Sequence, residues 1–71
     1  MTIPGSVTKV EWNAFIFCIN LTSVVIQDGV ESIGTGAFQF CEKLEVVELP
    51  ASVTSIGGSA FDGCKNLTSI T

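Results

Sequence analysis

The sequence predicts a single parallel solenoid, in which the chain winds through three similar coils and lays one strand of each coil side by side. Three observations predict it. The sequence repeats with a period of 23 residues, apolar positions alternate by two just before Pro50, and apolar residues recur at every third position from Phe61. We expect one solenoid segment over residues 1–71, with repeats at approximately 3–25, 26–48 and 49–71.

The period of 23 residues is visible as columns of apolar residues. No coil of this size can bury its inward residues alone, so each column is expected to pack against its neighbours above and below. The three phenylalanines of one column should therefore stack inside, about 5 Å apart along the axis. The columns are Ile3, Ile26 and Leu49; Val7, Val30 and Val53; Val10, Ile33 and Ile56; Ala14, Ala37 and Ala60; Phe15, Phe38 and Phe61; Cys18, Cys41 and Cys64; Leu21, Leu44 and Leu67; and Val24, Val47 and Ile70.

One side of each coil is predicted to be a β-strand. In the middle repeat, Val47 and Leu49 are two residues apart, which places both on the same face of a strand. Pro50 follows and has no N–H to donate, so it ends the strand. The matching strands are expected at 21–26 and 67–70, all running in the same direction. Together they predict a parallel sheet along one side of the solenoid.

The other side of each coil is predicted to hold a short extended piece, a corner and a helical turn. Val53 and Ile56 supply two inward anchors to the extended piece, and Gly57 follows at a corner where a positive φ is allowed. The apolar spacing of three that comes next suits a single turn of 3₁₀ or α helix with one buried edge. Its residues are Ala60, Phe61, Cys64 and Leu67.

Composition and charge exclude several classes of partner. The chain has three lysines, no arginine, seven acidic residues and a net charge of −4, so it lacks the clustered basic residues of a nucleic-acid-binding protein. No apolar run approaches the ~18 residues that a membrane-spanning helix needs, so we expect no membrane insertion. The first ten residues lack the pattern of a signal peptide, and we expect any export signal to lie outside this chain.

The three cysteines all fall in one column, and we expect them to be reduced structural thiols. Neighbouring coils would place Cys18, Cys41 and Cys64 about 5 Å apart at the backbone, which is within bridging distance. The thiols point the same way, however, so the geometry for a disulfide is poor. Collinear thiols also cannot surround a metal ion, and the chain has no histidine. We expect no metal, no cofactor and no enzymatic activity.

At this point the sequence resembles a known family. Residues 30–50 and 53–70 follow the unit L-P-x-x-V-x-x-I-G-x-x-A-F-x-x-C-x-x-L-x-x-I, which resembles the BspA-like leucine-rich repeat over essentially the whole chain. The resemblance implies a leucine-rich-repeat solenoid that serves as a binding scaffold, similar to surface adhesins of anaerobic bacteria and some parasitic protists. It implies an extracellular or cell-surface location and no catalytic residues. The first repeat departs from the unit, because Val10, Glu11 and Trp12 replace its Ile-Gly-x segment.

The outward face of the predicted sheet is one candidate interaction surface. In leucine-rich repeats the sheet face usually carries the binding site, and here it would be small and mildly acidic. The alternative is a merely solvated face, since three coils offer little area. The candidate residues are Ser23, Val25, Glu45, Val46 and Glu48.

A second candidate surface comes from large apolar residues that belong to no inward column. They lie on the helical-turn side and predict an exposed apolar patch of the kind that marks contact surfaces. The alternative is that the first coil is rearranged as a cap that covers its own end. The residues are Trp12, Ile16, Phe17, Ile19 and Phe40.

We therefore expect a non-enzymatic protein-interaction scaffold, an adhesin-like surface repeat segment that binds a protein or host-surface ligand. The alternative is a self-assembling structural unit that stacks head to tail into oligomers or filaments, because both ends of the solenoid lack an obvious polar cap. A homo-oligomer is expected, and whether it forms end to end or laterally through Trp12 and Phe17 is left open.

Overall fold

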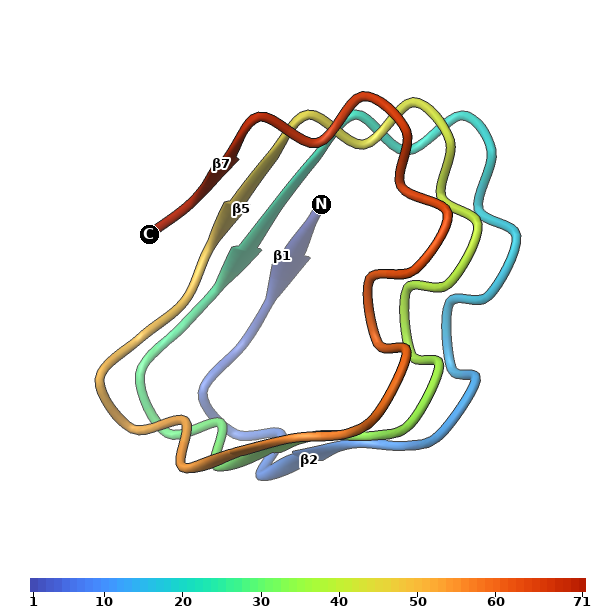
Figure 1. Ribbon diagram of the computed structural model, residues 1–71. Helices are drawn as coiled ribbons and strands as arrows, with labels where there is room; N and C mark the ends of the chain where they lie inside the picture. The colour runs from blue at the N-terminus through green and yellow to red at the C-terminus, as the bar shows by residue number, and fades with distance from the viewer.

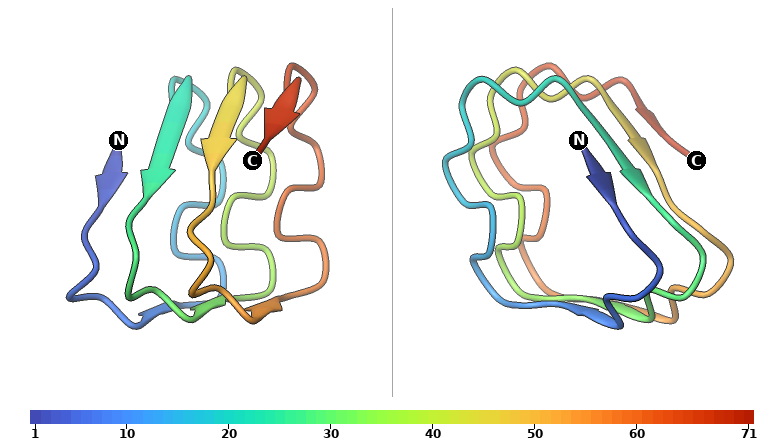
Figure 2. Two further views of the ribbon diagram at one scale, coloured as in Figure 1. Left: turned by 90° about the vertical axis from the view of Figure 1, so that its left-hand side faces the viewer. Right: turned by 180° about the vertical axis from the view of Figure 1, so that it is seen from behind.

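The computed structural model describes residues 1–71 and contains seven short strands in two parallel sheets. The first sheet has the order β1-β3-β5-β7 and the second the order β2-β4-β6. Figure 1 looks along the axis of the coils, and Figure 2 shows the strands of the first sheet side by side. The strands are β1 (Thr2–Ile3), β2 (Lys9–Val10), β3 (Ser23–Ile26), β4 (Ser32–Ile33), β5 (Val46–Glu48), β6 (Ser55–Ile56) and β7 (Ser69–Ile70).

The register of both sheets follows the repeat. Val24 pairs with Val47 and Val47 with Ile70 in the first sheet, while Val10 pairs with Ile33 and Ile33 with Ile56 in the second. The predicted parallel sheet is thus confirmed. The extended pieces, which the sequence placed only as isolated anchors, also pair with one another and form the second sheet.

The predicted helical turn is wrong, because the structure contains no helix. In the middle coil the N–H groups of Ala37, Gln39 and Cys41 close tight turns onto residues three back, at 3.1–3.3 Å. The N–H groups between them donate instead to the next coil, as Phe38 does to the Ala60 carbonyl at 2.8 Å. A helix would use consecutive N–H groups internally, so a segment that shares every second donor with its neighbour stays a chain of turns.

The core is made by the stacked columns and centres on the middle coil. Phe38 is fully buried, and its ring stacks on Phe15 at 5.2 Å and on Phe61 at 5.5 Å between centroids, as predicted. In the outer coils the residues of the same columns are more exposed to solvent, since each outer coil has a neighbour on one side only. Ile56 and Ile70, predicted as inward residues, are 48% and 47% exposed for this reason.

The three cysteines are free, and they form a ladder. The thiol of Cys41 donates to the Phe15 carbonyl at 3.3 Å, and that of Cys64 to the Phe38 carbonyl at 3.2 Å. Cys41 is buried, whereas Cys18 and Cys64 are half-buried. Burial raises the pKa of the Cys41 thiol from its ordinary value of 9.0 to about 11.

This raised pKa predicts a loss of stability in alkali. Below pH 9 the thiol is protonated in both states, but between pH 9 and 11 the unfolded chain ionises first, so the free energy of unfolding falls with rising pH. The full effect is about 2–3 kcal/mol, from ~1.4 kcal/mol per pKa unit. Urea unfolding under reducing conditions at several pH values measures it. Cys41→Ala should have a smaller slope and keep only the part due to Cys64, because burial raises the pKa of that thiol as well. An identical slope in the variant would contradict the assignment.

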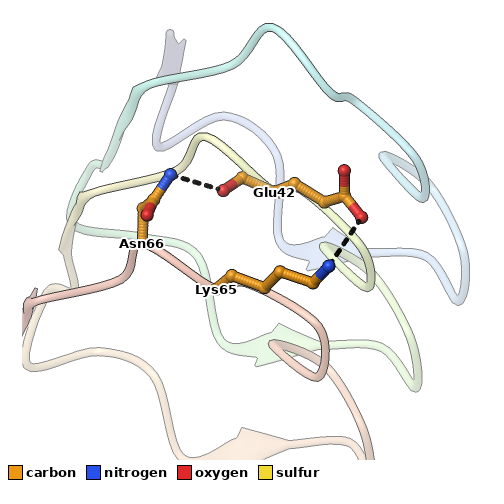
Figure 3. Close-up of polar contacts among 3 residues, drawn as sticks. All are labelled: Glu42, Lys65 and Asn66. Carbon is orange, nitrogen blue, oxygen red and sulfur yellow. Dashed lines mark hydrogen bonds and ion pairs between the residues drawn. The ribbon is translucent and has the colours of Figure 1, made fainter.

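A polar brace joins the middle and last coils on the surface (Figure 3). Lys65 Nζ lies 3.7 Å from Glu42 Oε2, and Asn66 Nδ2 donates to the Glu42 carbonyl at 3.0 Å. Both charged groups are well exposed, so the ion pair contributes little, within about 1 kcal/mol. Ile19 occupies the position of Glu42 in the first coil, so the first two coils lack this ion pair.

Candidate interaction surfaces

The outward face of the first sheet presents the predicted residues to solvent. Ser23, Glu45 and Glu48 are exposed, and Val25 and Val46 are each more than a third exposed. Neighbouring strands line these residues up, with Ser23 opposite Val46 and Val25 opposite Glu48. Neither of the two hollows of the molecule lies on this face. It is a flat, mildly acidic surface without a hollow that a partner's side chain could enter.

The turn side carries an aromatic pair formed by Phe17 and Phe40. Their rings stack at 5.1 Å between centroids with an angle of 13° between planes, and they are 61% and 38% exposed. In the last coil Gly63 holds the same position, and a Cβ there would run into the Phe40 ring. The ring of Phe40 thus lies over the backbone of Gly63, and the row of rings ends there.

Both members of the Phe17–Phe40 pair have a backbone conformation that bulky residues avoid. Their φ values are 61° and 60°, close to the 75° of Gly63. A left-handed conformation is uncommon for residues other than glycine, asparagine and aspartate, and it costs about 1–2 kcal/mol. The repeat therefore places two exposed aromatic rings where glycine fits better.

The other members of the predicted apolar patch are only partly brought together with this pair. Ile19 is 52% exposed and follows Phe17, whose carbonyl accepts its N–H at 2.8 Å. Ile16 is half-buried, so it adds less surface than expected. Trp12 is 70% exposed and stacks on no other ring; it lines a hollow beside the second sheet instead. The large apolar residues of the first coil are thus spread along the turn segment.

Two hollows lie at the surface. One is apolar, has a volume of about 320 Å³ and opens at the end of the first coil beside Met1, Ile3, Val7 and Phe15. The other, about 330 Å³, lies between the second sheet and the start of the turn segment. Its polar residues, among them Ser32 and Ser55, were not among the residues predicted from the sequence. The outward serines that recur one residue before Ile33 and Ile56 were the available signal.

Comparison with protein families decides the classification. The family described as "BspA type Leucine rich repeat region (6 copies)" matches residues 1–71. The chain belongs to the BspA-type leucine-rich repeat family. No curated protein and no solved structure matched in the other two comparisons. Membership of this family makes the chain a protein-interaction repeat module, and the two stacked parallel sheets are those of a leucine-rich-repeat solenoid.

Two structural findings bear on the kind of site that this leucine-rich repeat segment offers. No group of three or more His, Cys, Asp or Glu side chains is placed to hold a metal ion. The structure also contains no helical stretch with the length and apolarity that a bilayer crossing requires. The surface features of the molecule are the Phe17–Phe40 pair, the sheet face and the two hollows.

Proposed function

We propose that the chain is an adhesin-like segment that acts at a cell surface and binds a protein ligand through the Phe17–Phe40 pair. One observation carries this proposal: two aromatic residues hold left-handed backbone positions and yet remain exposed. Strained residues that contribute little to a core persist mainly where they serve a contact. Aromatic residues, phenylalanine among them, are also enriched in protein–protein interfaces.

The proposal predicts that the pair can be removed with little harm to the fold but at a large cost to binding. Phe17→Gly with Phe40→Gly copies the residue that the last coil uses at the same position. We expect at least a tenfold loss of affinity, about 1.4 kcal/mol or more. The probe is a panel of purified extracellular-matrix proteins, measured by biolayer interferometry against the immobilised chain.

A variant of the sheet face separates the two candidate surfaces. Val46→Lys places a charge among Ser23, Val25, Glu45 and Glu48 without entering the core, since Val46 points outward. It should leave the affinity within twofold. If Val46→Lys abolished binding and the double glycine variant did not, the binding site would be on the sheet face and not at the Phe17–Phe40 pair. Absence of binding to every protein of the panel at high micromolar concentration would count against an adhesin role.

A second candidate function, head-to-tail assembly, is favoured by the hydrogen-bond pattern of the outer coils. In the first and middle coils, Phe15 and Phe38 each donate an N–H to a carbonyl 22 residues ahead. Phe61 has no such acceptor, and the carbonyl of Ala14, which would be next in this series on a second copy, accepts no N–H. The N–H groups of Ser59 and Gly63 likewise have no backbone acceptor, and the same series would pair them with the free carbonyls of Trp12 and Ile16 on a second copy. The first coil of a second copy could therefore continue the hydrogen-bond series beyond the last coil.

Sedimentation velocity over a concentration series tests this second candidate. Open-ended growth with concentration is expected, because a head-to-tail contact need not close. Ile56→Lys should stop it, since Ile56 is already 48% exposed and its charge would meet the apolar end of the next copy. The double glycine variant should assemble like the wild type. A folded monomer at high micromolar concentration would rule assembly out.

A further inference from the structure

The hollow beside the second sheet lies where neighbouring coils approach each other closely. Gly34 and Gly57 are among the residues that line it. A Cβ on Gly34 would lie 2.5 Å from the backbone nitrogen of Trp12, and one on Gly57 would overlap the backbone nitrogen of Thr35. The backbone of the neighbouring coil fills the place of each missing side chain, and the hollow beside this contact has a volume of about 330 Å³. That volume is at the lower end of ligand sites, which run from roughly 300 to 1,000 Å³.

The hydroxyl groups that line the hollow are unused by the fold. Three hydroxyls of the chain bind neighbouring coils, those of Ser52, Thr54 and Thr68; Ser52 Oγ, for example, donates to the Val30 carbonyl at 2.8 Å. The side chains of Ser32, Thr35 and Ser55 make no hydrogen bond within the protein. The hollow therefore presents a short row of free donors and acceptors.

An exposed indole and two opposite charges complete the lining. Trp12, the single tryptophan of the chain, lines the hollow and is 70% exposed. Lys9 and Glu11 also line the hollow, and neither is in an ion pair. One charge of each sign leaves the lining without a net charge, so the site favours neither an anion nor a cation. It favours a neutral ligand with both an apolar face and many hydroxyls.

We propose that this hollow binds a neutral saccharide. The C–H face of a pyranose ring lies against the Trp12 indole, and its hydroxyl groups exchange hydrogen bonds with Ser32, Thr35 and Ser55. Lys9 and Glu11 supply one further donor and acceptor set. An indole is an amphipathic platform suited to a ligand with one apolar face. The site is separate from the Phe17–Phe40 pair, so it does not depend on protein binding at that surface.

Trp12 is itself the reporter for the test, because its fluorescence responds to occupation of the hollow. The probes are the methyl glycosides of glucose, galactose and mannose, N-acetylglucosamine and short neutral oligosaccharides made of these units. At least one should give a saturable change in the millimolar range. Glucuronic acid, sialic acid and a Gly-Ser peptide should give at least tenfold weaker responses. No response to any neutral saccharide, or an equal response to the acids or the peptide, would overturn the proposal.

Variants place the binding in the hollow. Ser32→Ala with Ser55→Ala should weaken binding of the best saccharide at least tenfold. Ser55→Ala alone, at an exposed position where we expect the fold to be kept, should weaken it at least threefold. Trp12→Ala, followed by NMR titration, should abolish binding. The matched control Phe17→Gly should leave the saccharide affinity unchanged while it weakens protein binding, which keeps the two proposals distinguishable. Unchanged affinity in Ser55→Ala and in the double serine variant would place the saccharide elsewhere and overturn the assignment.

Discussion

Phe38→Ala is expected to lower the free energy of unfolding by about 3–5 kcal/mol, the range found for removing a fully buried phenylalanine. Phe38 is completely buried and is the one ring that stacks on both column neighbours, Phe15 and Phe61. A chain of this length is stable by only about 4–10 kcal/mol, at ~0.05–0.15 kcal/mol per residue. The variant should therefore lose a large part of its stability, as urea titration followed by circular dichroism would measure.

Phe61→Ala is the matched control for this prediction. Phe61 belongs to the same column but is half-buried and stacks on Phe38 alone. Its loss should cost about half as much, because part of its surface is already hydrated. Equal losses from both variants would mean that the middle coil is not the centre of the core.

Gly34→Ala is the second large effect that we expect. The added methyl group would lie 2.5–2.8 Å from three backbone atoms of Glu11 and Trp12 in the preceding coil, so two coils must move apart. Overpacking of this kind costs roughly 1–3 kcal/mol, and we expect the upper end because no flexible side chain can give way. Gly34 has no unusual φ, so the loss would measure the close approach of the coils and not backbone strain.

Gly58→Ala provides the control, since a Cβ there meets no atom within 4 Å. Both substitutions reduce the freedom of the unfolded chain equally, so their difference isolates the steric term. Gly58→Ala should be neutral or stabilising by up to about 1 kcal/mol. A Gly34→Ala variant as stable as Gly58→Ala would show that the coils do not approach as closely as described.

The columns of the sequence were sufficient to predict the stacked core and the parallel sheet. A constant period fixes which residues meet, as Phe15, Phe38 and Phe61 do, whatever the local backbone is. The conformation of the turn segment could not be predicted in the same way. Apolar residues at every third position suit both a helical turn and a chain of tight turns, and the sharing of N–H groups between coils decides between them.

The candidate surfaces were predicted less well than the core. Residues outside the columns were expected to form one patch, but a position outside the core says nothing about where along the turn segment a side chain projects. Phe17 and Phe40 meet because they share a column, whereas Trp12 has Thr35 and Gly58 as its column neighbours. Gly63 was the available clue that Phe17 and Phe40 hold left-handed positions. Whether these residues form a binding site stays a prediction.

The stability of Phe17→Gly tests most directly whether the Phe17–Phe40 pair serves contact and not folding. Losing a ring that is 61% exposed and its stack removes about 1–2 kcal/mol, while relief of the left-handed conformation returns about 1–2 kcal/mol. We expect a free energy of unfolding within about 1 kcal/mol of the wild type. A loss of about 3 kcal/mol or more, comparable to that of a core phenylalanine, would make the ring structural and contradict a role in contact alone.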